Sequence, residues 1–481
     1  MKKTVFTLTL LISAINSIAC TGMIVGKNAS ADGTMIFARN EDFSSGFNPK
    51  RFIVVNARNI SMKKASDILK NPDTGFSHVL PRKTYKYTLI PDVDQNYGIF
   101  GEAGTNEMGV MVSATVSAKA GDEILKYDPY VKGGITEPDM ASLVLMSATS
   151  ARKGVEIIAD IIDKKGAGEG NIIFVSDQNE IWYMEIYTGH QYVAVKVPDD
   201  VYALVPNAYY LGNVDLQSKD TIASKDIKNL PLKHNLLKEN EKGFHLALTY
   251  REPQSKYNQI RIWATQNRLN PSTKEEFDND KTFELFRKPD KKIELKEVMT
   301  ILRDRYKGTK YYNNSDYRPI GIETNLETHI FQVRKNLPPI MWLSFGPVEH
   351  SVFVPHYGNI TSTPKEYSSE HYSYNSGSLY WTSKLINVFG KVDRATIGDN
   401  IMKYWSSIED QFIKNQALVD KKYMEIYKLK GKNSAEKFAT DMTYKNTKFI
   451  KDKADELYSE LAIYISSQAE SKPFKKPFEK K

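Results

Sequence analysis

Short apolar runs that end at Gly, Asn or Pro dominate the chain from residue 20 to residue 364 and predict a mostly β segment. Residues 23–25 and 35–38 predict two strands, joined by a turn over 28–33. Further on, SDQNE separates two apolar runs and predicts another hairpin turn. The clearest groups of strands are VLPRKTYKYTLIPD, NYGIFGEAGTNEMGVMVSATV, GNIIFVSDQNEIWYMEIYTGHQYVAVKV and YALVP.

Helical patterns interrupt this β segment and follow it. Residues 139–166 and 292–308 carry apolar side chains at helical spacing, and each stretch ends at a glycine. The serine-rich stretch over 365–379 predicts a loop. The amphipathic helix expected after it has one apolar face, formed by Ile397, Ile401, Trp405, Ile408 and Phe412.

Together these patterns predict an α+β protein. We expect a core over 20–364, a C-terminal helical section over 365–470 that packs on the core, and a basic tail over 471–481. Gly431 is expected to break the long C-terminal helix, and Ser434 to cap the next one. A separate binding module in the C-terminal section is the alternative. The sequence shows no internal repeat.

Residues 1–19 have the pattern of a secretory signal peptide. Lys2 and Lys3 precede an apolar stretch, and Ser17 and Ala19 stand at positions −3 and −1 of a cut before Cys20. We therefore expect an exported protein, periplasmic or extracellular. The alternatives are a membrane anchor and a buried strand, but the apolar stretch is short and interrupted by threonine and serine.

Cys20 is the only cysteine of the chain, which excludes an intrachain disulfide and indicates a special use of the thiol. Cleavage after Ala19 leaves Cys20 with a free α-amine and a free thiol. Their reference pKa values are about 7.7–8.0 and about 8.5, so the amine can take the thiol proton and later pass it to a leaving group. Lipid acylation of Cys20 is the alternative and would block both groups, although a lipoprotein signal usually carries a branched aliphatic residue where Ser17 stands.

The predicted hairpin brings Arg39 and Asp42 back beside Cys20, because two strands of similar length with a tight connection end where they began. The charge of Arg39 lowers the cost of forming a thiolate. Asp42 can hold and polarise the amine or the thiol. The alternative is a solvated charge cluster at the end of a strand.

An N-terminal cysteine, a short hairpin and then RNED resemble the N-terminal-nucleophile hydrolases. Within that group the chain is most similar to PepD-type dipeptidases, from the cysteine peptidase family that also contains the secernins. The related choloylglycine hydrolases and penicillin V acylases share the Cys start and the Arg-x-x-Asp spacing, met here by Arg39 and Asp42. Later segments follow in the order of the family: GTNEMGVMVSATVSA, VPNAYYLGNVDL, YNQIRIWATQNRLNP and MWLSFGPVEHSVFVPHYG.

The resemblance implies a four-layer αββα core and adds Asn106, Asn207 and Arg261 as site residues. Thiol attack on an amide forms a tetrahedral oxyanion, for which the two asparagines can supply N–H donors. For Asn106 the alternative is a turn between strands. Arg261 has an apolar setting and needs partners, so it clamps Asp42, binds a substrate carboxylate or holds the fold in an ion pair. A further alternative places Glu107 against a substrate amine.

Composition narrows the function classes that remain. The formal charge is +8 and no basic stripe is present, which argues against nucleic acid as a partner. No apolar run of about 18 residues follows the N-terminal segment, so the rest of the sequence predicts no membrane span. The eight histidines are dispersed; His350 and His356 would share a strand face, and ordinary polar positions are favoured over a metal pair. We expect no metal and no organic cofactor, and a homo-oligomer is left open.

The leading hypothesis is an exported cysteine dipeptidase that acts on small peptides. Cys20 attacks the scissile carbonyl, and its own α-amine acts first as base and then as acid. The two asparagines hold the oxyanion, while Asp42 and the two arginines orient and polarise the site. Two alternatives remain open: an acylase of non-peptide amides, and a non-catalytic lipoprotein anchored at Cys20.

Overall fold

The strand that follows Cys20 lies inside a six-stranded antiparallel sheet. The computed structural model describes residues 20–43, 48–60, 68–93, 99–114, 116–368 and 373–468, so the predicted signal peptide and basic tail lie outside the described residues. In the first sheet the strand order is β14 (Tyr202–Val205), β1 (Thr21–Val25), β2 (Met35–Asp42), β18 (Asn325–Val333), β19 (Ile340–Phe345) and β20 (Val354–Tyr357). β1 and β2 form the predicted hairpin, with Thr21 opposite Asn40, which confirms that the end of β2 returns to Cys20.

A second six-stranded antiparallel sheet is built from the middle of the chain. Its hairpin β11–β12 turns at residues 177–180, as the sequence predicts. The strand order is β15 (Thr221–Ala223), β13 (Tyr192–Lys196), β12 (Ile181–Ile186), β11 (Asn171–Ser176), β10 (Met111–Ser113) and β9 (Ala103–Thr105).

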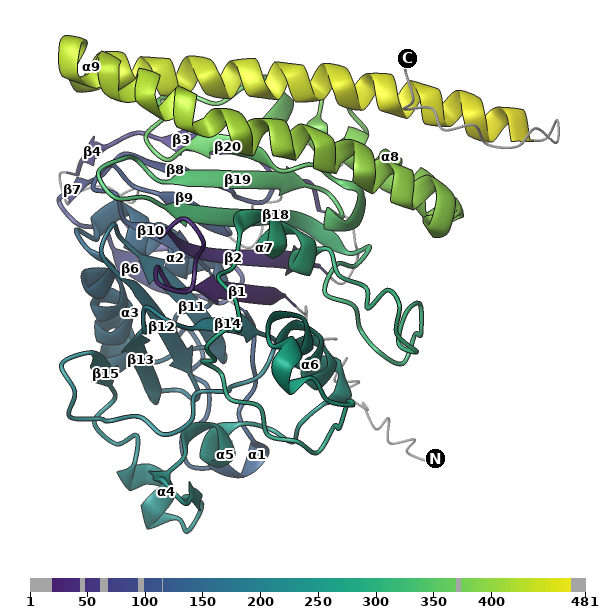
Figure 1. Ribbon diagram of the computed structural model, residues 1–481. Coiled ribbons are helices and arrows are strands. Elements are labelled where there is room, and N and C mark those ends of the chain that lie inside the picture. Colours follow the sequence, from purple (N-terminus) through teal and green to yellow (C-terminus); the bar gives the residue numbers. More distant parts are fainter. Residues whose placement is uncertain are drawn as a thin grey trace, which may run out of the picture.

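The two sheets pack face to face, and alternate residues of β11 show the two sides of the second sheet. Ile172 and Phe174 belong to the core shared with the first sheet, whereas Ile173 and Val175 belong to the core under the helices. A side chain at Gly22 would meet the Phe174 ring at 2.5 Å, so a glycine is needed there for the close approach of the sheets. Figure 1 shows the strands of both sheets in the middle of the molecule.

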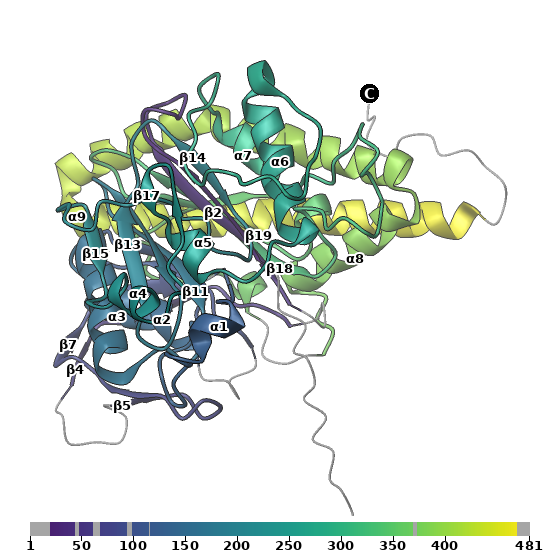
Figure 2. The same cartoon turned by 90° about the horizontal axis from the view of Figure 1, so that it is seen from below.

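Helices cover the outer faces of the sheets. α2 (Glu137–Ser147) and α3 (Ala151–Lys165) contact the second sheet, whereas α6 (Lys256–Leu269) and α7 (Leu295–Leu302) contact the first. Figure 2 shows these two pairs on opposite sides of the strands. Every residue of β1, β2, β18 and β19 is buried, as expected for strands that are covered on both faces. The fold is therefore α+β, as predicted.

Two of the predicted helices differ from the structure in extent. The pattern over 139–166 contains two helices, because Ala148 is extended and the Ser150 hydroxyl caps α3 through the Lys153 N–H. Gly166 ends α3 at φ 77°, as predicted. The stretch over 292–308 forms a helix only from Leu295 to Leu302, and a turn follows in which Tyr306 and Gly308 have positive φ.

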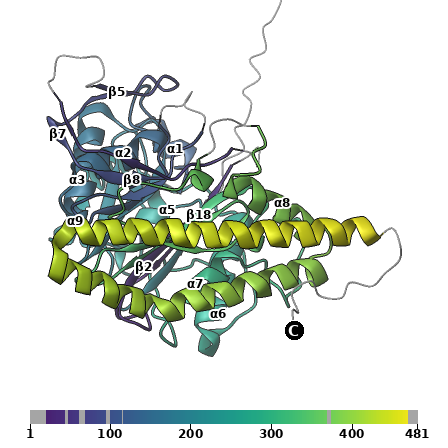
Figure 3. The ribbon, with the colours of Figure 1, turned by 90° about the horizontal axis from the view of Figure 1, so that it is seen from above.

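The C-terminal section forms α8 (Leu379–Val392) and the long α9 (Asp399–Ser467), which contact the first sheet at β19 and β20. Gly431 interrupts α9 at φ 79° and ψ 179°, so two arms run back along each other across the sheet edge (Figure 3). Ser434 does not cap the second arm, because its hydroxyl donates to the Lys430 carbonyl oxygen. Among the described residues, no helix combines the length and the apolarity that crossing a membrane requires.

Short elements complete the fold around the two sheets. The short strands are β3 (Ile53–Val55), β4 (Arg58–Asn59), β5 (Ile68–Lys70), β6 (Ser77–Val79), β7 (Lys83–Thr84), β8 (Tyr87–Leu89), β16 (Glu239–Asn240) and β17 (Gly243–Phe244). The short helices are α1 (Asp122–Leu125), α4 (Asn229–Lys233) and α5 (Leu246–Tyr250).

Candidate active site

Cys20 directly precedes β1, and its side chain faces the second sheet. It is two residues before Gly22, whose missing side chain points at Phe174, and residues two apart share a strand face. The Cys20 side chain is buried, and its Sγ is 3.9 Å from Nη1 of Arg39, which donates to it. Burial raises the pKa of the Cys20 thiol well above its usual range, and the charge of Arg39 offsets only part of that rise. The thiol therefore needs a base to become a nucleophile.

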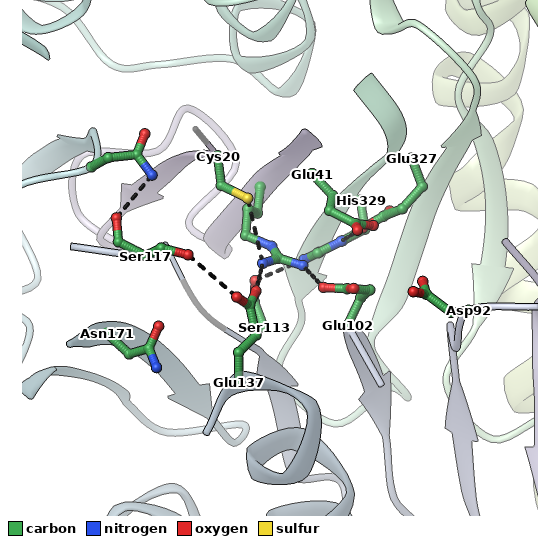
Figure 4. Close-up of polar contacts among 12 residues, drawn as sticks. Cys20, Glu41, Asp92, Glu102, Ser113, Ser117, Glu137, Asn171, Glu327 and His329 are labelled. Atoms are coloured by element: carbon green, nitrogen blue, oxygen red, sulfur yellow. Dashed lines mark hydrogen bonds and ion pairs between the residues drawn. The ribbon is translucent and has the colours of Figure 1, made fainter. Parts of the chain in front are cut away.

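Arg39 lies between two carboxylates from the other sheet layer. It forms ion pairs with Glu102, which precedes β9, and with Glu137 at the start of α2, the latter at 3.3 Å. Burial alone would lower the pKa of Arg39, but Glu102 and the other nearby charges raise it above its usual range. Figure 4 shows these carboxylates gathered beside the Cys20 sulfur. Arg39 therefore stays charged beside the thiol.

A buried lysine lies behind Arg39 and holds three carboxylates. Lys50 Nζ bonds Glu41 at 2.5 Å, Glu102 at 2.9 Å, and Asp92. The oxygens of these acids lie within 4.8 Å of one another, a geometry that could hold a metal ion, but the Lys50 ammonium already occupies that place. Burial favours the neutral form of Glu102, but Lys50 and Arg39 together lower its pKa to about 2. This lysine and its carboxylates fix the position of Arg39.

Arg261 and Asn207 hold the backbone at Cys20. Nη1 of Arg261 donates to the Cys20 carbonyl oxygen and to Thr21 Oγ1, both at 2.7 Å, and Nη2 donates to Asn207 Oδ1 at 3.0 Å. Its remaining N–H groups donate to Asn258 Oδ1 and the Tyr257 carbonyl oxygen. All five donors of the guanidinium are therefore used within the protein, and none of them contacts Asp42. Of the alternatives for Arg261, the clamp on Asp42 is wrong, and contact with a substrate carboxylate stays a prediction.

Asn207 joins this network to the wall of a cavity. Its Nδ2 donates to the Ser117 carbonyl oxygen at 2.9 Å, and the Ser117 hydroxyl donates to Glu137 Oε2 at 3.3 Å (Figure 4). Ser117, Glu137 and Asn207 line a cavity of about 380 Å³. The site thus has a chain of polar contacts that runs from Arg261 through Asn207 to the cavity.

Asp42 faces the opposite side of the first sheet from Arg39. Its carboxylate accepts hydrogen bonds from Arg318 and from Asn325. Arg318 also donates to Thr21 Oγ1 at 3.3 Å, and burial lowers its pKa to about 10. The sequence analysis missed Arg318, because it lies in the polar stretch NNSDYRP, which has no periodicity and is typical of an exposed loop.

Asn106 does not have the predicted role in the oxyanion site. Both donors of its amide are used, by the Leu145 carbonyl oxygen at 3.0 Å and the Ala148 carbonyl oxygen at 2.8 Å. Its Oδ1 accepts the N–H groups of Met108 and Val110. Asn106 therefore stabilises the β9–β10 turn and ties it to the end of α2, which leaves no N–H group for an oxyanion. Glu107, the alternative ligand for a substrate amine, lies in the same turn, and its carboxylate accepts the backbone N–H of Lys86, which precedes β8.

His350 and His356 do not form the metal pair that was considered. His350 ends a short 3₁₀ turn and bonds Asn387 Oδ1 at 2.7 Å, whereas His356 lies on β20 and bonds the Tyr367 hydroxyl at 2.8 Å. Burial lowers the pKa of His356 to about 3. Both are neutral core histidines that join the first sheet to the segments packed on it.

An α+β fold that gathers a cysteine, two arginines and an asparagine into one buried network beside a cavity has the composition of a hydrolase site. The chain belongs to peptidase family C69, whose pattern matches residues 19–407. The predicted resemblance is thereby confirmed, and the protein is a peptidase, a hydrolase of peptide bonds.

Several relatives match the sequence of this chain over most of their length. The chain is 37% identical over 462 residues to probable dipeptidase B of Streptococcus pyogenes serotype M3, covering 90% of this chain and 92% of the relative. It is 34% identical to a probable dipeptidase of Latilactobacillus sakei, covering 83% and 89%. A solved structure, a variant of conjugated bile acid hydrolase from Clostridium perfringens, matches with a TM-score of 0.29 and 13% identity over 75% of this chain and 98% of that chain, too low for a structural argument.

Proposed function

We propose that this peptidase is an exported cysteine dipeptidase with Cys20 as its nucleophile. The observation that carries the proposal is the place of the single cysteine, at the start of β1, with Arg39 on its sulfur and Arg261 on its carbonyl oxygen. The names of the relatives as dipeptidases support the small-peptide substrate. The signal pattern of residues 1–19 supports export and a cut that makes Cys20 the first residue.

The proposed reaction begins with proton transfer inside one residue. The α-amine of a mature Cys20 takes the thiol proton as the sulfur attacks the scissile carbonyl carbon, and a tetrahedral oxyanion forms. The amine then passes the proton to the leaving amine, and a thioester results. Water attacks the thioester by the same route and releases the second product. A thiol whose pKa is raised by burial is protonated at rest, so a built-in base is required.

The surrounding residues divide the remaining tasks. The Asn207 amide is the donor proposed for the oxyanion, because Arg261 and Ser117 fix its orientation at the site. The charge of Arg39 stabilises developing negative charge near the sulfur. Arg261 and Arg318 both hold Thr21 and so fix the backbone that carries the nucleophile. We also propose the four-layer αββα arrangement of N-terminal-nucleophile hydrolases, supported by two facing sheets with helices on both outer sides.

Hydrolysis of a panel of dipeptides by the mature protein and by its Cys20→Ala variant tests the proposal. We expect the variant to lose activity by roughly 10⁴-fold or more while its circular dichroism spectrum is unchanged. Dipeptide hydrolysis that persists in Cys20→Ala would exclude the mechanism. In the same panel, faster cleavage of N-acyl amides than of dipeptides would indicate an acylase instead.

The maturation step has its own test by mass spectrometry of the N-terminus. We expect a free Cys20, because acylation would block both the amine and the thiol. A diacylglyceryl group on Cys20 would instead support the lipoprotein alternative. A protein that retains residues 1–19 should be inactive, since the α-nitrogen of Cys20 is then an amide without basicity.

A further inference from the structure

Glu137 stands between the nucleophile and the cavity. Its Oε1 accepts from Arg39 Nη1 at 3.3 Å, and the same Nη1 is 3.9 Å from the Cys20 sulfur. Its Oε2 accepts from the Ser117 hydroxyl, and both residues line the cavity (Figure 4). Glu41 and Glu102 also lie near Cys20, but neither lines the cavity. Among the described residues, Glu137 is thus the carboxylate that shares an Arg39 N–H group with the Cys20 sulfur and also lines the cavity.

The neighbourhood of Glu137 offers hydrogen-bond acceptors and few cations. Glu169 lines the same cavity and accepts the Glu137 backbone N–H at 2.7 Å and Asn171 Nδ2 at 3.2 Å, and no basic side chain of the described chain forms an ion pair with it. Among the described residues that line the cavity, Lys119 is the one basic side chain, and it bonds Asp122 at 2.9 Å.

Asn171 supports Glu169 from behind the cavity wall, where its Nδ2 donates to Glu169 Oε1. Asn171 is fully buried, and its Oδ1 has no hydrogen-bond partner among the described residues. Figure 4 shows the Asn171 side chain on the same side of Cys20 as Ser117 and Glu137. Asn171 does not line the cavity, so its role is to orient Glu169 and not to contact the substrate.

We propose that Glu137 binds the α-ammonium group of the substrate's first residue, which makes peptides with a free N-terminus the substrate class. The inference rests on the proposed function and deepens it. In a peptide whose first peptide bond is cleaved, the α-nitrogen is two bonds, or about 2.5 Å, from the carbonyl carbon that the thiol attacks. The group that binds this nitrogen must therefore lie directly beside Cys20, where Glu137 is. An ammonium also adds a positive charge to a stretch of wall formed by the Glu137 and Glu169 carboxylates.

This assignment separates a dipeptidase from an acylase with the same nucleophile. An N-acyl amide would place an uncharged alkyl or aryl group against Glu137 and remove water from its carboxylate without giving a donor in return. Selectivity for a free amine would then arise from one carboxylate and not from the catalytic groups. The first side chain of the substrate would occupy the rest of the cavity.

The test compares two substrates that differ only in the ammonium group, Ala-Ala and propionyl-Ala, on three proteins. The wild type should cleave Ala-Ala with a kcat/KM roughly 10- to 100-fold above that for propionyl-Ala, as loss of a charge-assisted hydrogen bond predicts. Glu137→Gln keeps the shape and removes the charge, and it should bring this ratio down to within a few-fold of one. Glu102→Gln is the matched control: it removes the other carboxylate on Arg39 without touching the cavity, so it should lower both rates and preserve the ratio.

Each outcome decides between the inference and the proposed function. If the wild type cleaves both substrates equally well, the inference is wrong, whether or not Glu137→Gln folds. If Glu137→Gln lowers both rates in parallel, as Glu102→Gln does, its role is confined to positioning Arg39 and the inference is again wrong. If Ala-Ala cleavage by the wild type does not depend on Cys20, the proposed function itself is excluded.

Discussion

The residues around Cys20 lie on the two faces of the β1–β2 hairpin. Cys20 and Arg39 face the second sheet, where Glu102 and Glu137 meet the guanidinium. Thr21 and Asp42 face the opposite side and are held there by arginines, as the Arg318 contacts with Asp42 and Thr21 show. The face of the hairpin toward the cavity and the face held by Arg318 are therefore separate, and they can be perturbed separately.

Replacing Arg318 with lysine tests the supporting side. An ammonium cannot reproduce the planar fork that contacts Asp42 and Thr21 together, so the backbone at Cys20 becomes less well fixed. We expect kcat to fall by about 10- to 100-fold with little change in KM, because one charge-assisted hydrogen bond is lost and the cavity is not touched. Steady-state kinetics on dipeptides measure both constants.

The control for this variant is Arg268→Lys, which changes a partly exposed pair with Glu297. We expect that variant to keep kcat within about twofold of the wild type, since exposed pairs contribute little. An Arg318→Lys enzyme with unchanged kcat would show that the fork on Asp42 has no part in the reaction.

At the scale of elements, the sequence predicts well what is decided locally. The β1–β2 and β11–β12 hairpins follow from alternating side chains and turn residues, and the hairpin alone brings Arg39 and Asp42 toward Cys20. Helix ends that depend on distant packing are predicted less well, as the early end of α7 shows. Asn207 and Arg261 were predicted as site residues from a family resemblance. The hydrogen bond between them could not be predicted, because the two residues lie far apart in the chain.

The missed features have a common physical cause. Arg318 is buried only because its loop folds onto the outer face of the first sheet, and a loop sequence carries no periodic signal of burial. Asn106 was assigned to the oxyanion because its residue type fits that chemistry. In the structure, both N–H groups of its amide donate to backbone carbonyl oxygens instead. The type of a residue limits its possible roles, but its contacts with residues distant in the sequence decide which role it has.

The junction between β20 and α9 yields a prediction for pH. His356 bonds the Tyr367 hydroxyl and Thr443 of α9, and burial lowers its pKa from the usual 6.5 to about 3. Below pH 6.5 the His356 imidazole therefore binds a proton in the unfolded chain, whereas in the folded chain it stays neutral down to about pH 3. The free energy of unfolding should therefore fall as pH falls through this window, by up to about 1.4 kcal/mol per pH unit from this group.

Urea unfolding of the wild type and of His356→Gln between pH 7 and pH 4 measures this contribution. Glutamine does not titrate, so the variant is expected to be less stable at pH 7 and to lose less stability on acidification. Curves that stay parallel across the window would show that His356 is not the group that links stability to pH.

At the scale of the whole molecule, buried charges join the two sheets. Arg39 and Glu41 come from the first sheet, and Glu102 comes from the edge of the second, with Lys50 bonded to both of these carboxylates. Near Cys20 the layers are thus joined by ion pairs, whereas further along they are joined by apolar side chains and by the hydrogen bond between His329 on β18 and Ser113 on β10 at 2.8 Å. Removal of one member of this network of ion pairs should lower the free energy of unfolding strongly, because the remaining charges stay buried without their partner.

Replacing Lys50 with methionine is the sharpest test of that coupling. The change keeps an unbranched side chain one atom shorter but leaves Glu41, Asp92 and Glu102 without the ammonium that neutralises them. We expect the free energy of unfolding to fall by about 3–5 kcal/mol, and dipeptidase activity to fall with it as Arg39 loses its support. The matched control is Lys164→Met, which breaks an exposed pair with Asp160 and should cost less than about 1 kcal/mol. If chemical denaturation gave the two variants equal stability, the carboxylates would have to be neutral in the folded protein, and these ion pairs would add nothing to the joining of the sheets.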